Sequence, residues 1–178
     1  PVQPSHWMTG GAVLVCCAAT YWDLRERRIP NAVTLPALGI ALLLHGATQA
    51  GQGLLFSVLG ALAAGALLLP GYLLRATGAG DVKLLMAVGA FLGWPTALLA
   101  GLLSLVVGGV LGLVFALLKG RLGIVLSRSF GLARWMALKA AGTPLARPGT
   151  SGLKLPFGVA IALATAWVAW GPPLGGIR

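Results

Sequence analysis

The stretch TALLAGLLSLVVGGVLGLVFALL, residues 96–118, decides the fold of this chain. It contains no charged side chain, and it is long enough to cross the hydrocarbon core of a bilayer, which takes about 20 helical residues. An unpaired backbone polar group is costly in lipid, so a segment that crosses a membrane without strand partners forms a helix. The stretch therefore predicts a membrane-spanning helix.

The composition of the whole chain agrees with this stretch. Of its 178 residues, 58% are hydrophobic and only 9% are charged, whereas a soluble domain carries about 25% charged residues. So little polar surface excludes a soluble enzyme, a disordered tail and a disulfide scaffold. We expect one integral-membrane domain over residues 1–178.

Apolar stretches recur along the chain and predict an all-α polytopic membrane protein with six transmembrane helices. The expected spans are Trp7–Trp22, Ala32–Ala50, Leu54–Leu74, Asp81–Trp94, Thr96–Leu118 and Leu155–Trp170. The first has no basic region before it, so it does not resemble a cleaved signal peptide.

Charge predicts how these spans are oriented. The chain has 13 basic and 3 acidic residues, and every basic residue except Arg178 lies in or just beyond the loops after the first, third and fifth spans. Basic residues stay on the cytoplasmic side, so both termini are expected outside. A net charge of +10 often indicates nucleic acid, but in so apolar a chain it indicates anionic membrane lipids instead.

The long loop between the fifth and sixth spans is strongly basic. Its residues 122–138 mix large apolar side chains with Arg128 and Arg134, which is typical of a basic amphipathic helix on the inner leaflet. A solvated loop is the alternative.

The three acids are the candidates for chemistry, because ionisable residues at membrane depth are costly and usually functional. Asp23 ends the first span and Asp81 opens the fourth, so both are expected on the cytoplasmic side, where they can meet. The fourth span is about six residues, or roughly 9 Å, too short to cross the hydrocarbon. Asp81 is therefore expected in a dip in the inner face, with Glu26 a solvated loop charge.

Two carboxylates in such a place favour aspartyl proteolysis, because neighbouring like charges share one proton at neutral pH. Gly78 and Gly80 precede Asp81 and remove side chains, which lets a substrate backbone approach. The plainer alternatives are a helix-end charge for Asp23 and an N-cap for Asp81.

The remaining polar residues predict no other chemistry. His6 and His45 are expected on the outer side, His45 as a packed or interfacial residue, and Cys16 and Cys17 are adjacent. They form neither a Ser-His-Asp set nor a metal cage, so no metal and no cofactor are expected. Lys83 is interpreted as an interfacial anchor and Asn31 as a helix cap.

These residues together resemble the type IV prepilin peptidases, polytopic GxGD-type aspartyl proteases of the bacterial inner membrane. The resemblance covers nearly the whole chain and rests on Asp23 with Arg25, on Ile29-Pro30-Asn31, on Gly78-Ala79-Gly80-Asp81-Val82-Lys83-Leu84 and on Leu155-Pro156-Phe157-Gly158. It implies that Asp23 and Asp81 are the catalytic pair. The residues expected to support them and the approach of the substrate are Gly78, Gly80, Lys83, Asn31 and Pro156.

The resemblance also implies the substrate. Such peptidases cut the short basic leader from prepilins and pseudopilins at the cytoplasmic face, just before the pilin's hydrophobic helix. Members that also N-methylate the new terminus carry an extra cytoplasmic region with paired CxxC motifs, which is missing from this sequence. The chain is more similar to the short peptidases of tight-adherence pilus systems, and no methyltransferase activity is expected.

Two other classes stay open at this point. A presenilin-like protease shares the aspartate motif, but it is longer and ends on a Pro-Ala-Leu motif. A small proton-coupled transporter would use the two aspartates as a relay, although relay acids usually lie near the middle of the membrane.

Overall fold

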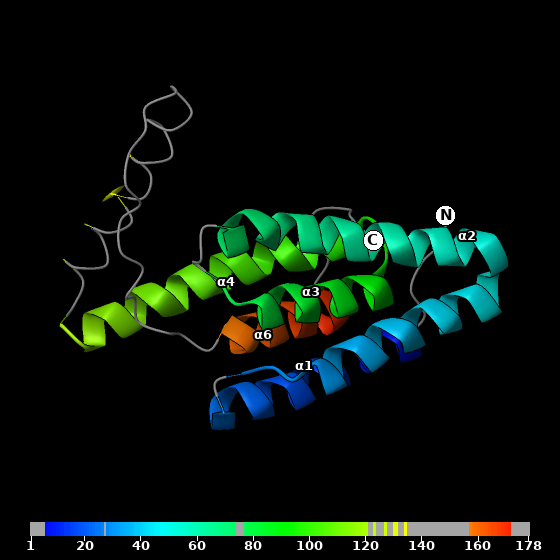
Figure 1. Cartoon of the computed structure of the whole chain (residues 1–178), viewed down its shortest axis with the longest axis horizontal. Coiled ribbons are helices and arrows are strands. Elements are labelled where there is room, and N and C mark those ends of the chain that lie inside the picture. The colour runs from blue at the N-terminus through cyan, green and yellow to red at the C-terminus, as the bar shows by residue number, and fades with distance from the viewer. Residues whose placement is uncertain are drawn as a thin grey trace. The chain divides into compact units, whose positions relative to one another are not determined.

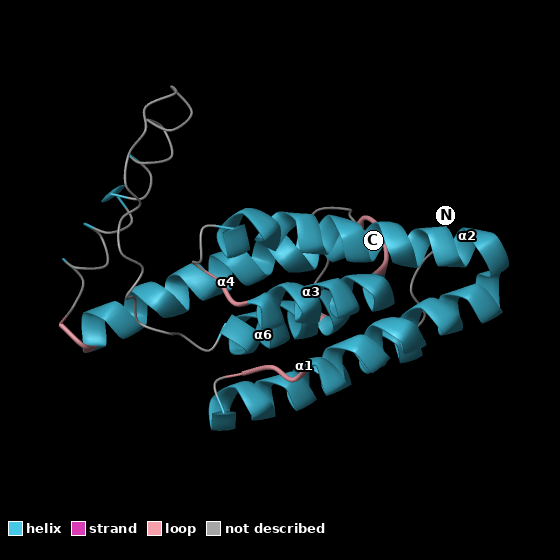
Figure 2. Cartoon of the chain, in the orientation of Figure 1, coloured by secondary structure: helices cyan, strands magenta, loops and turns pink. Residues whose placement is uncertain are grey.

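The part of the chain that the structure, a computed structural model, describes consists of residues 6–26, 28–73, 77–120, 123, 127, 130–131, 134 and 157–171. Its five helices are α1 (His6–Glu26), α2 (Asn31–Leu73), α3 (Ala79–Leu92), α4 (Thr96–Leu118) and α6 (Phe157–Trp170). No strand occurs in these ranges (Figure 2). The predicted all-α class is therefore confirmed for the described residues.

Helix α2 covers two of the predicted spans. It is broken at Gln49 (φ −133°, ψ 16°) and Ala50 (φ 51°, ψ −140°), and Figure 1 shows its two arms meeting at a sharp bend. A Cβ atom on Gly53 would collide with the carbonyl oxygen of His45, so only glycine fits the inside of this bend. The two arms correspond to the predicted spans 32–50 and 54–74.

Two helices of the described residues are long and apolar enough to cross a membrane, namely α2 and α4, and α6 is a shorter apolar helix. Many large side chains of α4 are exposed, among them Leu102, Val106 and Leu113, which is the surface that lipid would cover. The count of six spans and the outward orientation of both termini stay predictions.

The chain divides into two compact units, Pro1–Gly108 with Pro156–Arg178 and Gly109–Leu155. In the first unit α3 packs mainly against α2, while α1 packs against α6 and α3. Leu84, Leu85, Val88 and Leu92 of α3 are all fully buried. Helix α3 is therefore the central element of this unit.

Glycine allows the close packing of α2 and α3. A Cβ atom on Gly89 would lie 2.5 Å from the carbonyl oxygen of Gly60 and 2.7 Å from the Cβ atom of Ala64. Small residues at such a contact let two helix backbones approach each other. His45 is also buried against α3, where its Nε2 atom lies 3.1 Å from the carbonyl oxygen of Phe91, as expected for a packed residue.

The second unit contains the end of α4 from Gly109 onward. The ammonium of Lys119 lies 5.3 Å from the centre of the Phe115 ring. Most of the predicted amphipathic helix, residues 122–138, falls outside the described residues, and so does Pro156.

Candidate active site

Asp23 lies in the last turn of α1 and is only 9% exposed. Its Oδ2 atom accepts a hydrogen bond of 3.2 Å from the backbone N–H of Gly158, the second residue of α6. The first N–H groups of a helix have no acceptor within the helix, so they are free to bind a carboxylate. A neighbouring helix therefore holds one oxygen of Asp23.

Asp81 is the third residue of α3 and is partly buried. Its Oδ2 atom accepts a hydrogen bond of 3.0 Å from the backbone N–H of Gly78, the N-cap of the helix. The N-cap interpretation of Asp81 is therefore corrected, because the helix begins two residues earlier than expected and Asp81 reaches back from position N3. Asp81 does help to cap its helix, and this role is compatible with chemistry at its other oxygen.

The two carboxyl groups interact electrostatically. Burial raises the pKa of Asp23 and that of Asp81, and the charge of Asp23 raises the pKa of Asp81 further. In both cases the glycine N–H opposes the effect of burial. The packing of α1, α3 and α6 on one another thus brings together the two acids that the sequence singled out.

The spaces beside Gly78 and Gly80 are occupied in the structure. A Cβ atom on Gly80 would lie 3.0 Å from the Cβ atom of Ile29, in the connection between α1 and α2. A Cβ atom on Gly78 would lie 3.2 Å from the Oδ2 atom of Asp81. The two glycines therefore make room for Ile29 and for the aspartate itself, and their role in substrate approach stays a prediction.

The other supporting residues fall close to these helix starts. Asn31 is the first residue of α2, and its Oδ1 atom accepts a hydrogen bond of 2.9 Å from the ammonium of Lys83 on α3. Its expected role as a helix cap is not confirmed, because this side-chain oxygen bonds to Lys83. Lys83 therefore has a specific partner within the protein, beyond the interfacial anchoring that the sequence suggested.

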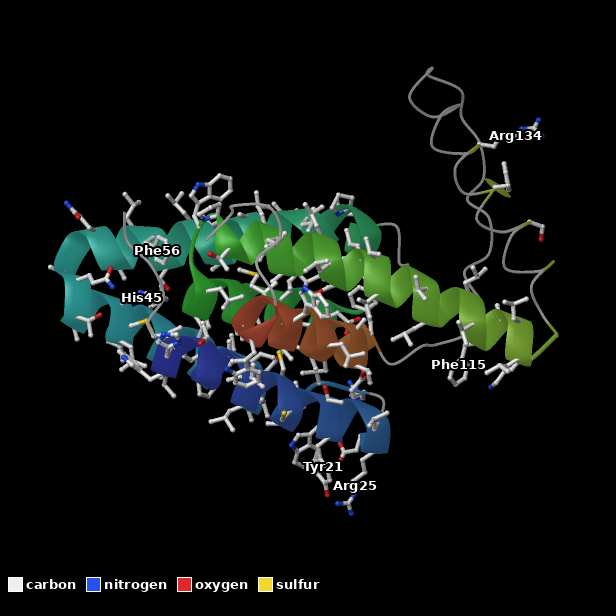
Figure 3. The ribbon with its side chains drawn as sticks, turned by 180° about the vertical axis from the view of Figure 1, so that it is seen from behind. Tyr21, Arg25, His45, Phe56, Phe115 and Arg134 are labelled. Carbon is white, nitrogen blue, oxygen red and sulfur yellow. The ribbon has the colours of Figure 1, made fainter. Side chains whose placement is uncertain are left out.

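Arg25 does not neutralise Asp23. Its guanidinium donates a hydrogen bond of 2.8 Å to the hydroxyl of Tyr21 and lies 6.0 Å from the centre of that ring, and Figure 3 shows the two side chains together at the end of α1. Glu26, the last residue of α1, is exposed as expected. The interpretation of Asp23 as a salt-bridged helix-end charge is not supported by these contacts.

Sequence reasoning missed two functional contacts, those of Gly158 and Thr20. Gly158 belongs to one of the motifs quoted above, but nothing in the spacing indicated that its N–H meets Asp23. The hydroxyl of Thr20 donates a hydrogen bond of 3.3 Å to the carbonyl oxygen of Gly158. Thr20 and Gly158 are 138 residues apart, and the pattern of apolar residues in a helix does not indicate which distant residue a hydroxyl group will bond.

The arrangement is suited to general acid–base chemistry. Each carboxylate has one oxygen held by a backbone N–H, which leaves its second oxygen for a substrate or a water molecule. A coupled pair of this kind shares a proton, so one member can act as a base while the other acts as an acid. Among the described residues, no group of three His, Cys, Asp or Glu side chains is placed to hold a metal ion.

A comparison with known families identifies the chain. Residues 11–113 match the model of the type IV leader peptidase family. The match includes Asp23, Asn31 and Asp81 but ends before α6. Neither a curated protein nor a solved structure matches the chain. The match spans more than half of the chain, and so, with the apolar helices, it identifies a membrane peptidase that belongs to the type IV leader peptidase family.

Proposed function

We propose that this peptidase is an aspartyl endopeptidase of the GxGD type, in which Asp23 and Asp81 together activate a water molecule. The observation that carries the proposal is the coupling of these two acids. They come from helices α1 and α3, the charge of one acts on the other, and each is oriented by a glycine N–H. The chain has only one further acid, Glu26, and its side chain is exposed.

In the proposed reaction the ionised member of the pair takes a proton from water, and the water oxygen attacks the scissile carbonyl carbon. The protonated member donates its proton to the carbonyl oxygen. The resulting tetrahedral intermediate breaks the C–N bond when the leaving nitrogen receives a proton from the pair. One of the two hydroxyl groups of the intermediate gives its proton back to the pair as the carbonyl re-forms. No covalent acyl-enzyme forms, and the pair returns to its singly protonated state.

The proposed substrate is the basic leader peptide of a type IV prepilin or pseudopilin, cut at the cytoplasmic face of the bacterial inner membrane. The family match supports a leader peptide as the substrate. The distribution of basic residues supports a cytoplasmic position for both acids. The sequence holds no CxxC motif, in keeping with the short peptidases of tight-adherence systems and with no methylation step.

Anionic lipids are the proposed surface partner of the enzyme. Tyr21 and Arg25 lie at the end of α1 expected to face the cytoplasm, and Tyr21 is 56% exposed. The Trp22 ring packs edge-on against Tyr21, with 6.1 Å between ring centres. An aromatic pair beside an arginine suits the level of the lipid head groups, where the ring lies at the interface and the cation meets phosphate.

The proposal is tested by cleavage of a prepilin by the purified protein in detergent. Asp23→Asn and Asp81→Asn should each abolish cleavage, because an amide keeps the shape of the side chain but neither takes up nor supplies the proton. Each general acid–base contribution amounts to about 10²–10⁴ in rate. Glu26→Gln is the matched control, and it should cleave at the wild-type rate.

The same assay separates the proposal from a proton-coupled transporter. A protease shortens the prepilin in detergent, where no ion gradient exists, whereas a transporter leaves it intact. Wild-type cleavage by either Asp→Asn variant would overturn the two-aspartate mechanism.

A further inference from the structure

Two hydrogen bonds join the start of α6 to the last two turns of α1, and both involve Gly158. The Thr20 hydroxyl donates to the carbonyl oxygen of Gly158 at 3.3 Å, and the N–H of Gly158 donates to the Oδ2 atom of Asp23 at 3.2 Å. Thr20 and Asp23 are three residues apart and thus share one face of the helix. Figures 1 and 3 show α6 alongside α1, and residues of the two helices are in contact.

Gly158 lies so close to Asp23 that a side chain at this position would make the carboxylate move. Gly158 is buried, and a Cβ atom at this position would lie 3.0 Å from the Oδ2 atom of Asp23 and 3.5 Å from its Cβ atom. An added methyl group would therefore displace the carboxylate by a few tenths of an ångström. The glycine allows the backbone to approach the carboxylate closely enough to donate to it.

We infer that Gly158 and Thr20 are positioning residues for Asp23: Thr20 fixes the Gly158 peptide, and this peptide fixes the carboxylate. The inference rests on the proposed function of Asp23 and extends it to α6, which lies outside the family match. A buried carboxylate needs a hydrogen-bond donor, and an N–H in the first turn of a helix also brings the positive end of the helix dipole. One oxygen of Asp23 is thereby held, and the other is left for the water molecule.

The two aspartates differ in how they depend on the rest of the fold. Asp81 obtains its N–H from Gly78, three residues away at the start of the same helix. Asp23 accepts its hydrogen bond from the N–H of Gly158, 135 residues away in the sequence. A change at Thr20 or Gly158 should therefore disturb Asp23 and leave the capping of Asp81 intact.

Few ionisable side chains lie on the helices around Asp23, so a pH profile can report on its hydrogen bond with Gly158. Helix α6 has no ionisable side chain, and the ionisable side chains of α2 are His45 and Tyr72. Helix α3 brings Asp81 and Lys83, and Arg25 and Glu26 follow on α1 itself. The hydrogen bond from Gly158 favours the ionised form of Asp23, so weakening this bond should move the acidic limb of the activity profile to higher pH.

The experiment compares paired variants of the full-length protein in the prepilin assay. Thr20→Val should lower kcat by about two- to tenfold, which is the scale of one neutral hydrogen bond, with KM little changed. Thr20→Ser keeps the hydroxyl and should restore the rate. Gly158→Ala should lower kcat further and shift the acidic limb upward, because its methyl group acts directly on the carboxylate.

Matched controls come from the same helices and from another helical glycine. Thr165 of α6 accepts a weak hydrogen bond from Cys16 of α1, with 3.6 Å between the sulfur and oxygen atoms, so Thr165→Val disturbs the α1–α6 interface away from Asp23. A Cβ atom on Gly39 meets nothing within 4 Å, so Gly39→Ala tests the effect of the methyl group alone. Both controls should keep the wild-type pH profile.

Two results would overturn the inference. One is that Thr20→Val keeps the wild-type kcat in folded protein. The other is that the Thr20→Val and Thr165→Val variants lose activity only in proportion to their thermal stability, with unchanged pH profiles. Asp23→Asn, assayed in parallel, separates this outcome from failure of the proposed function: an inactive Asp23→Asn beside an unaffected Thr20→Val refutes the positioning role alone.

Discussion

The ammonium of Lys83 donates a hydrogen bond of 2.9 Å to the side-chain oxygen of Asn31, and this bond joins the start of α3 to the start of α2 across 52 residues of sequence. Lys83 lies two residues after Asp81, on the first turns of the same helix. The bond therefore holds the start of α2 next to the helix end that carries one of the proposed catalytic acids.

Removing this bond should affect activity more than stability. Lys83→Met and Asn31→Ala should each lower the cleavage rate by about two- to tenfold, because an exposed hydrogen bond contributes about 0.5–1.5 kcal/mol and the helix starts would separate slightly without it. The melting temperature in detergent should change little. The double variant should be no worse than either single variant, because both remove the same bond.

Lys119→Met is the control for loss of a lysine, since Lys119 lies just after α4 and contacts Phe115 of that helix. It should keep the wild-type rate. If Lys83→Met and Lys119→Met behave alike, the contact with Asn31 has no part in activity.

The contact between Gly80 and Ile29 predicts a rescue by size. Gly80→Ala should lower both activity and stability, because its Cβ atom would lie 3.0 Å from the Cβ atom of Ile29 and 3.5 Å from the Ile29 Cγ1 and carbonyl oxygen atoms. Shortening the neighbour in the double variant Ile29→Ala/Gly80→Ala should recover part of the loss. Cleavage rate and melting temperature measure both effects. A double variant that is worse than Gly80→Ala would show that Gly80 is needed for another reason, such as the approach of the substrate.

Much of the fold could be read from the sequence because lipid imposes a simple rule. Each apolar stretch of about 20 residues must be helical, and the observed α1, α2, α3, α4 and α6 all lie on predicted spans. The break in α2 was also anticipated, since spans 32–50 and 54–74 were expected to be separate. The sharpness of that break was not predicted: it brings Gly53 against His45 and Gln49 of the same helix, a contact that hydrophobic periodicity does not reveal.

The site was only partly predictable. Asp23 and Asp81 stood out because the chain has so few acids, and because the predicted topology puts both on the cytoplasmic side. Their partners did not stand out, because backbone N–H groups such as those of Gly78 and Gly158 exist at every residue and give no signal in the sequence. The position of Ile29 beside Gly80 was not predicted either, and the expected role of Gly80 in substrate approach stays a prediction.

The close approach of α2 and α3 predicts a strong effect on stability. Gly89→Ala should destabilise the protein by about 1–3 kcal/mol, the usual cost of overpacking, because the new Cβ atom would lie 2.5 Å from the carbonyl oxygen of Gly60. Gly39→Ala is the matched control on α2, where the new methyl group meets nothing within 4 Å. Thermal unfolding in detergent measures both variants. Equal melting temperatures for the two would contradict the packing described here.

The orientation in the membrane is tested by labelling with a membrane-impermeant maleimide. The native thiols, Cys16 and Cys17, are first replaced, and single cysteines are introduced at the exposed positions Gln52 and Lys119. Because basic residues stay in the cytoplasm, position 52 should react from the periplasm and position 119 only after the membrane is opened. Reaction of both positions from the periplasm would separate the acids from the cytoplasm and refute the proposed location of cleavage.

The last prediction concerns the dependence of cleavage on pH. Asp23 and Asp81 lie outside the two candidate spans α2 and α4, and burial raises the pKa of both, the charge of Asp23 raising that of Asp81 further. Cleavage needs one protonated and one ionised carboxyl group. At low pH both are protonated and no base remains, whereas at high pH both are ionised and no acid remains.

The rate should therefore follow a bell-shaped curve whose two apparent pKa values belong to the pair. Because both shifts are upward, the acidic limb should lie above the ordinary aspartate pKa of about 3.9. The profile is measured as kcat/KM on a prepilin in a neutral detergent, which avoids the proton enrichment at an anionic lipid surface. An acidic limb at or below pH 3.9 would contradict the burial of Asp23, and a rate that stayed constant at high pH would show that no protonated carboxyl group takes part.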